Sequence, residues 1–201
     1  MNTNVIALVI GLAVAPACGG GDAAPVIPDG PPGDVVTYNM MTSKGLITLE
    51  THHSWAPNGV DRFADLVASG FYTDARFFRV IDGFVAQFGI NGTPATDAMW
   101  SSRTISDDPV ARSNVRGYLT FAQTSAPDSR TTQLFINLVD NSFLDNMGFA
   151  PFAVVTAGMD VADQLDSEYG EMPDQDMISA TGNSYLAANF PNLDYVIAIA
   201  P

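Results

Sequence analysis

The residues with the clearest chemical potential are Arg79 and Gln87, which lie in the otherwise apolar and aromatic run Phe77–Gln87. Lysine and arginine together account for only 8 of the 201 residues. A cation in apolar surroundings is costly unless it is paired or used. Because arginine keeps its proton at ordinary pH, Arg79 can donate hydrogen bonds and stabilise electron density but cannot act as a general base. The pattern therefore favours a reaction without bond-making chemistry, or binding alone.

Other kinds of catalytic site have few residues from which to be built. His52 and His53 are adjacent, so on a strand their side chains point to opposite faces and make a poor chelate. The single cysteine, Cys18, precedes the expected domain, which leaves a zinc site almost no ligands and excludes an internal disulfide. The chain has no Gly-x-Ser-x-Gly elbow, and residues 88–92 lack the Lys-Ser/Thr of a phosphate loop. We therefore expect neither a metal nor a cofactor.

The elements that must position Arg79 are mostly short strands. Strands at Val35–Met41 and Leu46–Thr51 flank a hairpin signal. A helix is expected from Ala56-Pro57-Asn58 to a stop at Gly70, with one apolar face at helical spacing, and a second helix after Gly158-Met159-Asp160. The remaining strands are expected at Phe77–Gln87, Tyr118–Gln123, Gln133–Val139, Phe152–Thr156 and Tyr195–Ile199. Many short strands with only two helices predict an all-β barrel or sandwich.

The N-terminal segment has the features of an export signal. Val5–Ala17 is an apolar run of 13 residues, which is too short to span a bilayer of about 30 Å but suits the apolar region of a signal peptide. Cys18 follows directly, as in a bacterial lipoprotein signal where the thiol is acylated, although Ala15-Pro16-Ala17 fits an ordinary signal cleavage site equally well. We expect a signal peptide over 1–17, a Gly/Pro-rich tether over 18–33 and a folded domain over 34–201.

The charge of the chain limits its partners. It carries 8 basic and 22 acidic residues, for a formal net charge of -14. This charge repels phosphate backbones and anionic lipid, so we expect no nucleic-acid binding. We expect an exported monomer, located in the periplasm or anchored to an envelope membrane through a lipidated Cys18.

The run Phe77–Gln87 resembles the signature of the cyclophilins, Phe-His-Arg-Val-Ile-x-Gly-Phe-x-x-Gln. Further similarities follow in family order at Gly70-Phe71-Tyr72, Arg116–Gln123, Thr132–Ile136, Phe143-Leu144-Asp145 and Gly158–Val161. Together they cover roughly residues 35–199. The resemblance implies a mainly β fold, a closed antiparallel barrel of eight strands capped by two α-helices, in agreement with the expected elements. It also implies peptidyl-prolyl cis-trans isomerase activity on proline-containing polypeptides.

The resemblance assigns a role to each residue of the site. Arg79 would donate toward the prolyl nitrogen, Gln133 would hold Arg79 and the substrate carbonyl, and Gln87 would orient the arginine. The other substrate-binding residues would be Phe84, Val85, Phe135 and Leu144 around the proline ring, Ala122 and the backbone of Gln123 along the neighbouring groove, and Phe143 and Phe149 at the pocket margin.

Two departures from the family pattern, and two alternatives, bear on the function. Phe78 stands where many members have histidine, and Phe143 replaces a common tryptophan. Because Phe143 lacks the indole N–H donor of tryptophan, we expect cyclosporin binding to be weakened more than catalysis. A non-catalytic proline-peptide-binding or chaperone module could use the same fold, although the presence of Arg79 argues against it. A barrel that binds an apolar ligand inside would need a hollow core, whereas the many large apolar side chains favour a filled one.

Overall fold

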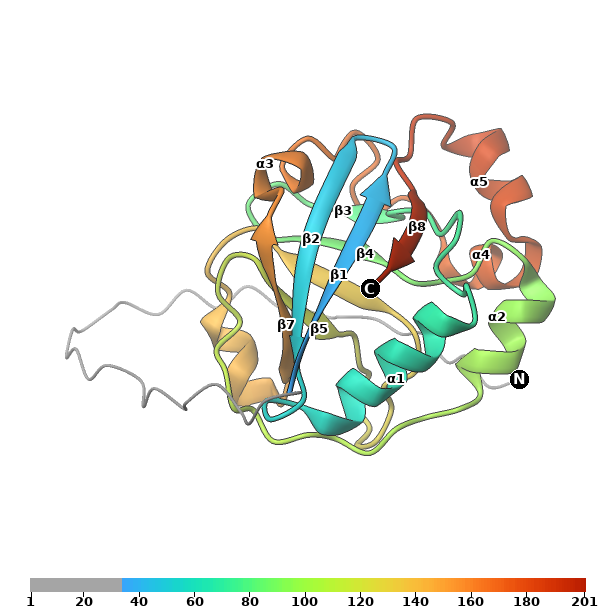
Figure 1. Cartoon of the computed structure of the whole chain (residues 1–201). Helices are drawn as coiled ribbons and strands as arrows, with labels where there is room; N and C mark the ends of the chain where they lie inside the picture. Colours follow the sequence, from blue (N-terminus) through green and yellow to red (C-terminus); the bar gives the residue numbers. More distant parts are fainter. Residues whose placement is uncertain (1–33) are drawn as a thin grey trace.

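The computed structural model describes residues 34–201, which form one antiparallel sheet of eight strands with helices around it (Figure 1). The strands are β1 (Val35–Thr42), β2 (Gly45–His52), β3 (Arg79–Val80), β4 (Val85–Phe88), β5 (Tyr118–Phe121), β6 (Leu134–Asn137), β7 (Pro151–Ala157) and β8 (Val196–Ala200). Their order across the sheet is β3-β4-β6-β5-β7-β2-β1-β8. The expected signal peptide, tether and Cys18 lie outside the described residues.

The sheet curls until its two ends meet. Arg76 and Tyr195, just before the end strands β3 and β8, form an isolated antiparallel bridge. Beside it, the backbone nitrogen of Phe77 donates to the carbonyl of Asp194 over 2.9 Å, and that of Val196 donates to the carbonyl of Ala75 over 2.9 Å. The expected eight-stranded antiparallel barrel is therefore confirmed, with its ends joined by a short bridge rather than by a continuous strand ladder.

More helices surround the sheet than the two that the sequence predicts. The helices are α1 (Pro57–Ala68), α2 (Pro94–Ser101), α3 (Met159–Ala162), α4 (Gln175–Thr181) and α5 (Asn183–Asn189), with a 3-10 helix, η1 (Ser142–Met147). The expected helices correspond to α1 and to α3, which has only 4 residues. Figure 1 shows α2, α4 and α5 together on one side of the sheet, away from α3. We call α4 and α5, together with the segment 166–174 that leads into α4, the helical layer.

The helix α1 forms where its sequence predicts. Pro57 occupies the first turn, where its missing N–H costs nothing. Val60, Phe63 and Leu66 are buried on one face, as their spacing indicates. The chain then turns through Gly70, whose φ of 71° suits glycine. This helix covers one end of the barrel core and packs against β2, β7 and β8.

The run Phe77–Gln87 is a hairpin rather than the single expected strand. β3 and β4 are joined by a turn at Gly83, which has a φ of 71°. In this turn the nitrogen of Ile81 donates to the carbonyl of Val85 over 2.9 Å, and that of Phe84 donates to the carbonyl of Ile81 over 3.0 Å. Glycine interrupts the strand because it adopts this backbone conformation without steric cost.

Along both β4 and β6, alternate side chains point to opposite faces of the sheet and therefore lie in two different environments. Ala86, Phe88, Leu134 and Ile136 belong to the main core, which is filled by large side chains such as Phe121 and Phe152. The residues between them, Val85, Gln87 and Phe135, point to the opposite face of the sheet. That outer face carries the candidate site.

Candidate active site

The β3–β4 hairpin places Arg79 beside Gln87. The two residues are directly opposite each other in the antiparallel register, so their side chains share one face of the sheet. The Arg79 Nη1 donates to Gln87 Oε1 over 3.3 Å. The two residues are eight positions apart in the sequence, and they meet because the chain folds back in a hairpin between them.

The polar contact continues to Gln133, which immediately precedes β6. The Gln87 Nε2 donates to Gln133 Oε1 over 2.8 Å. This bond fixes the orientation of both amides, because each carbonyl oxygen accepts and the Gln87 nitrogen donates. Within residues 34–201 the side-chain nitrogen of Gln133 has no acceptor, so it can donate to a substrate carbonyl.

The backbone before Gln133 is held in place by hydrogen bonds between Thr132 and two other residues, Tyr72 and Gly89. The Tyr72 hydroxyl donates to the carbonyl of Thr132 over 3.0 Å, and the Thr132 hydroxyl donates to the carbonyl of Gly89 over 2.8 Å. Burial raises the pKa of Tyr72 well above its usual value, so this hydroxyl remains a donor. A Cβ at Gly89 would lie 2.5 Å from the Thr132 oxygen, so only glycine allows this close approach.

We call the hydrogen-bonded side chains of Arg79, Gln87 and Gln133 the polar relay. An apolar cluster lies next to it. Its buried members are Val85, Ala122, Phe135, Leu144 and Phe149, and Phe84 packs against them. The rings of Phe135 and Phe149 meet edge to face, with centroids 5.8 Å apart. The Arg79 guanidinium carbon lies 5.5 Å from the centre of the Phe84 ring, which joins the polar relay to the apolar cluster.

A network of asparagines supports this cluster from behind. The Asn141 side chain donates to the carbonyl of Phe84 over 3.0 Å, and the Asn114 side chain donates to the carbonyl of Phe149 over 2.8 Å. Asn114 also donates to Asp145 in η1 over 2.8 Å. These buried and partly buried hydrogen bonds hold two phenylalanines of the apolar cluster at fixed positions. No local sequence pattern predicts these hydrogen bonds, because the bonded residues are far apart along the chain.

The remaining predicted residues, Phe143 and Gln123, lie at the margins of the apolar cluster. Phe143 is 46% exposed, and its ring stacks on Phe84 with centroids 6.3 Å apart. The side chain of Gln123 is turned toward the end of η1, where its Nε2 donates to the carbonyl of Met147 over 3.0 Å. The backbone N–H and C=O of Gln123 form no hydrogen bond to the described residues, so they are free to pair with an extended peptide.

The structure adds one residue that the sequence does not single out. Glu171 lies between α3 and α4, and its Oε1 accepts a hydrogen bond from Arg79 Nε over 2.7 Å. The same oxygen accepts a second bond from Arg79 Nη2. The side chain of Arg79 is 9% exposed and that of Glu171 is 63% exposed. The arginine of the site therefore has a carboxylate partner on its solvent side.

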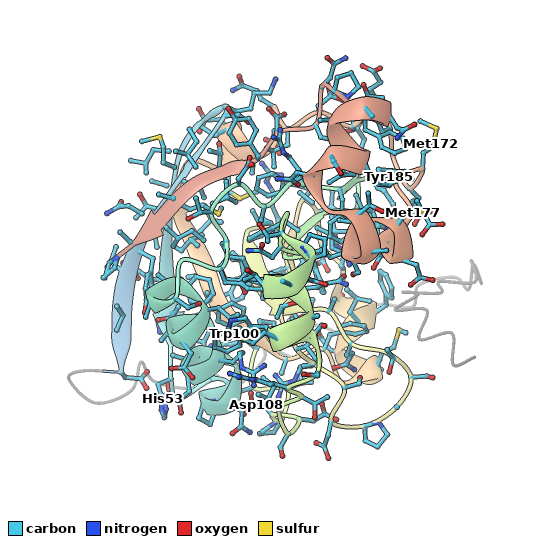
Figure 2. All side chains as sticks on the ribbon, turned by 90° about the vertical axis from the view of Figure 1, so that its right-hand side faces the viewer. His53, Trp100, Asp108, Met172, Met177 and Tyr185 are labelled. Atoms are coloured by element: carbon cyan, nitrogen blue, oxygen red, sulfur yellow. The ribbon has the colours of Figure 1, made fainter. Side chains whose placement is uncertain are left out.

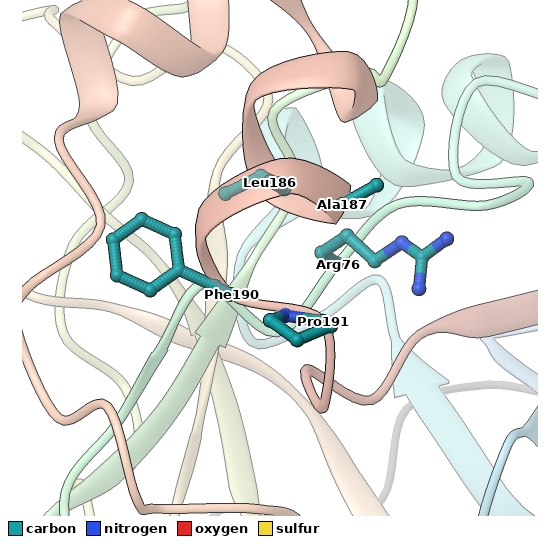
Figure 3. A pocket seen from close by; sticks show the side chains of 5 residues that line it. All are labelled: Arg76, Leu186, Ala187, Phe190 and Pro191. Carbon is teal, nitrogen blue, oxygen red and sulfur yellow. The ribbon is translucent and has the colours of Figure 1, made fainter.

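Two further features lie apart from this arrangement. Figure 3 shows a pocket of about 170 Å³ lined by Arg76, Leu186, Ala187, Phe190 and Pro191, none of which belongs to the relay or the apolar cluster. In the part of the chain that the structure describes, no group of three or more His, Cys, Asp or Glu side chains could hold a metal ion.

Comparisons with known proteins identify the family of the chain. Residues 37–182 match the family model described as "Cyclophilin type peptidyl-prolyl cis-trans isomerase/CLD". Peptidyl-prolyl cis-trans isomerase B of Escherichia coli (strain K12) is 34% identical over 171 residues, covering 81% of this chain and 96% of that protein. Peptidyl-prolyl cis-trans isomerase A of Dickeya dadantii (strain 3937) is 38% identical over 130 residues, covering 63% of this chain and 68% of the relative.

Solved structures show the same fold. A cyclophilin from Hirschia baltica gives a TM-score of 0.62 at 20% identity, covering 82% of this chain and 73% of that one. A cyclophilin type peptidyl-prolyl cis-trans isomerase from Cryptosporidium parvum gives a TM-score of 0.63 at 20% identity, covering 83% of this chain and 96% of that one. By its family match and its relatives, the chain belongs to the cyclophilin type peptidyl-prolyl cis-trans isomerases.

Proposed function

We propose that the chain accelerates cis–trans isomerisation of X-Pro bonds in polypeptides, with Arg79 as the catalytic donor. Rotation about a peptide bond faces a barrier of about 18–20 kcal/mol that amide resonance sets. An X-Pro bond prefers trans by only about 0.5–1 kcal/mol, so both isomers are populated and the barrier alone limits their exchange. A catalyst therefore needs to weaken conjugation in the twisted state, and it does not need to break a bond.

Arg79 suits this task because a guanidinium can donate to the prolyl nitrogen as that nitrogen becomes pyramidal. The bond forms only when conjugation is lost, so it stabilises the transition state more than the ground state. Each 1.36 kcal/mol of such differential stabilisation gives about a tenfold gain in rate. Gln133 would donate to a substrate carbonyl, and the backbone of Gln123 would pair with the peptide, so that the proline ring enters the apolar cluster.

The observation that carries the proposal is the fixed guanidinium beside an apolar cluster. Gln87 holds one terminal nitrogen of Arg79, and Gln133 holds Gln87 in turn. The cluster of Val85, Phe135 and its neighbours offers apolar contact of the kind that a proline ring buries. No group that must gain or lose a proton is required, which agrees with a reaction that transfers none.

The test is the refolding of a client whose slow phase is limited by proline isomerisation. Wild-type chain should accelerate this phase, and Arg79→Ala should lower kcat/KM by about 10²–10³-fold, as the loss of one transition-state donor does elsewhere. Arg103→Ala removes an exposed arginine at the end of α2 and serves as the matched control. Equal rates for wild type and Arg79→Ala would exclude Arg79 as the catalytic donor. Binding of proline peptides without any acceleration would favour the non-catalytic module instead.

We also propose that the chain acts outside the cytoplasm. The support is the sequence of Val5–Ala17 and the cysteine that follows it. Among residues 34–201, no helix is both long and apolar enough to cross a membrane. Mass spectrometry of the mature N-terminus from a bacterial envelope fraction tests both export and lipidation. A chain that begins at an acylated Cys18 supports anchoring, and an uncleaved Met1 contradicts export; Cys18→Ser is the control for the acyl mass.

A further inference from the structure

Arg79 has a second partner that comes from outside the barrel. Glu171 lies 92 residues further along the chain, and one of its oxygens accepts from both Nε and Nη2 of the guanidinium. Of the salt bridges formed among the described residues, this is the one that includes Arg79. A buried guanidinium without a carboxylate is costly, so this pair lowers the cost of keeping a cation in the site.

The hydrogen bonds leave part of the guanidinium free. The group has five N–H bonds. Glu171 engages two of them, at Nε and Nη2, and Gln87 engages one at Nη1. The two remaining N–H bonds belong to the terminal nitrogens. The guanidinium is thus held from two sides and still keeps donors for a substrate.

The position of Glu171 is fixed by anchors on both sides of it. Before it, the backbone nitrogen of Asp166 donates to Asp194 over 2.7 Å, and the ring of Tyr169 meets that of Phe190 edge to face. After it, the carboxylate of Asp174 caps α4, accepting from the backbone nitrogens of two residues in its first turn. Glu171 therefore belongs to a docked segment and not to a loose loop.

The helical layer packs against Phe78, the residue next to Arg79. Phe78 is buried in a small cluster with Ile90, Ile178, Leu186 and Leu193, against which Tyr169 and Tyr185 pack. Figure 2 shows Met172, Met177 and Tyr185 on the same flank of the molecule. The aromatic side chain at position 78 thus docks the layer that carries Glu171, immediately beside the arginine that Glu171 contacts.

We propose that Glu171 is a positioning residue for Arg79, an inference that rests on the proposed function. Glu171 and Gln87 together restrict the orientation of the guanidinium and leave two of its N–H bonds for the substrate. Catalysis by positioning depends on such restraint, because displacements of about 1 Å can cost large factors in rate. Loss of Glu171 leaves one restraint of two, so turnover should fall while peptide binding changes little.

A competing role for Glu171 predicts the opposite result. A carboxylate that must leave Arg79 before the substrate can bind would act as an internal competitor. Its removal would then lower KM and raise kcat/KM. The two free N–H bonds favour positioning, since the substrate can bind without displacing the carboxylate.

The test compares kcat and KM of the full chain on an Ala-Pro tetrapeptide for four proteins: wild type, Glu171→Ala, Glu171→Gln and Glu168→Ala. We expect Glu171→Ala to lower kcat/KM by about three- to tenfold, almost entirely in kcat. Glu171→Gln keeps a neutral acceptor and should lie between Glu171→Ala and wild type. Glu168→Ala removes an exposed carboxylate from the same segment, one that accepts a hydrogen bond from Asn192 over 3.4 Å, and should match wild type.

A second measurement separates positioning from a general structural effect. In an Arg79→Ala background, Glu171→Ala should have no further effect on kcat/KM, because its influence acts through the guanidinium. A further loss in that background overturns the inference, as does an unchanged or raised kcat/KM for Glu171→Ala alone. A wild-type chain without activity overturns the proposed function first, and an active one with an indifferent Glu171 overturns only the positioning role.

Discussion

Phe78→Ala should undock the helical layer from the sheet while leaving the barrel folded. Phe78 directly precedes β3 and is 1% exposed. It belongs to the small cluster that also contains Ile178 and Leu186 of the helical layer. The main core contains none of these three side chains. Truncating Phe78 therefore removes packing from the contact between sheet and layer, and not from the barrel interior.

The magnitude follows from the burial of the ring. Truncation of a buried phenylalanine to alanine costs about 3–5 kcal/mol in a well-packed core. The cluster has only five buried members and lies on a flank, so its neighbours can partly collapse into the space. We expect a loss of about 3 kcal/mol in the free energy of unfolding. For a domain of this size, that loss lowers Tm by about 6–12 °C.

The assay combines urea denaturation with hydrogen exchange of individual amides. Protection in α4 and α5 should fall more than protection in β4 and β6, because local opening of the layer becomes easier. Phe143→Ala is the matched control: its ring is 46% exposed, so the change should stay within about 0.5–1 kcal/mol. A loss below about 1 kcal/mol for Phe78→Ala, or an equal drop in protection across layer and barrel, would refute this reasoning.

Three further predictions concern the relay and two buried carboxylates. Gln87→Leu removes the acceptor for Arg79 and the donor to Gln133, so kcat/KM for a proline peptide should fall about 10–100-fold; an unaltered value would mean that the relay does not position the arginine. Asp108→Ala leaves the buried guanidinium of Arg130 without its 3.0 Å partner and should cost about 3–5 kcal/mol in urea denaturation, whereas a loss under about 1 kcal/mol contradicts a buried pair. Burial raises the pKa of Asp97 above its usual 3.8, so its charged form is disfavoured in the folded state and stability falls as pH rises through that raised pKa. Asp97→Asn should therefore raise Tm at pH 7 and flatten its dependence on pH from 4 to 7, and an unchanged slope counts against this cause.

The sequence predicts the residues that one strand pair can bring together. Arg79 and Gln87 belong to a single short motif, and their register in the hairpin gives a direct contact. Gln133 and Phe135 come from a distant strand, and their place beside the motif was available only through the resemblance to the cyclophilins. The structure places them beside the motif because β6 lies next to β4 in the sheet. This strand order is a property of the whole fold and not of any local sequence pattern.

The helical layer could not be predicted in the same way. Its apolar residues Ile178 and Leu186 belong to two helices of 7 residues each, too short for a clear periodic pattern. Gly182 separates these helices, with φ 69° and ψ -152°, a conformation essentially confined to glycine. Glu171 is one of many acidic residues in a chain of net charge -14, so its type carries no signal. Its importance appears only when the layer is docked beside Arg79.

The arrangement makes most of the site independent of the barrel core. On β4 and β6 alternate residues face the core or the site, so a substitution at Gln87 or Phe135 changes the outer face without opening the barrel interior. Arg79 is the exception, because one of its two protein partners comes from a layer that packs through Phe78. Activity should therefore depend on the docking of α4 and α5 even when the barrel remains fully folded. It follows that Phe78→Ala, which alters no atom of the relay, should reduce turnover in the same direction as Glu171→Ala.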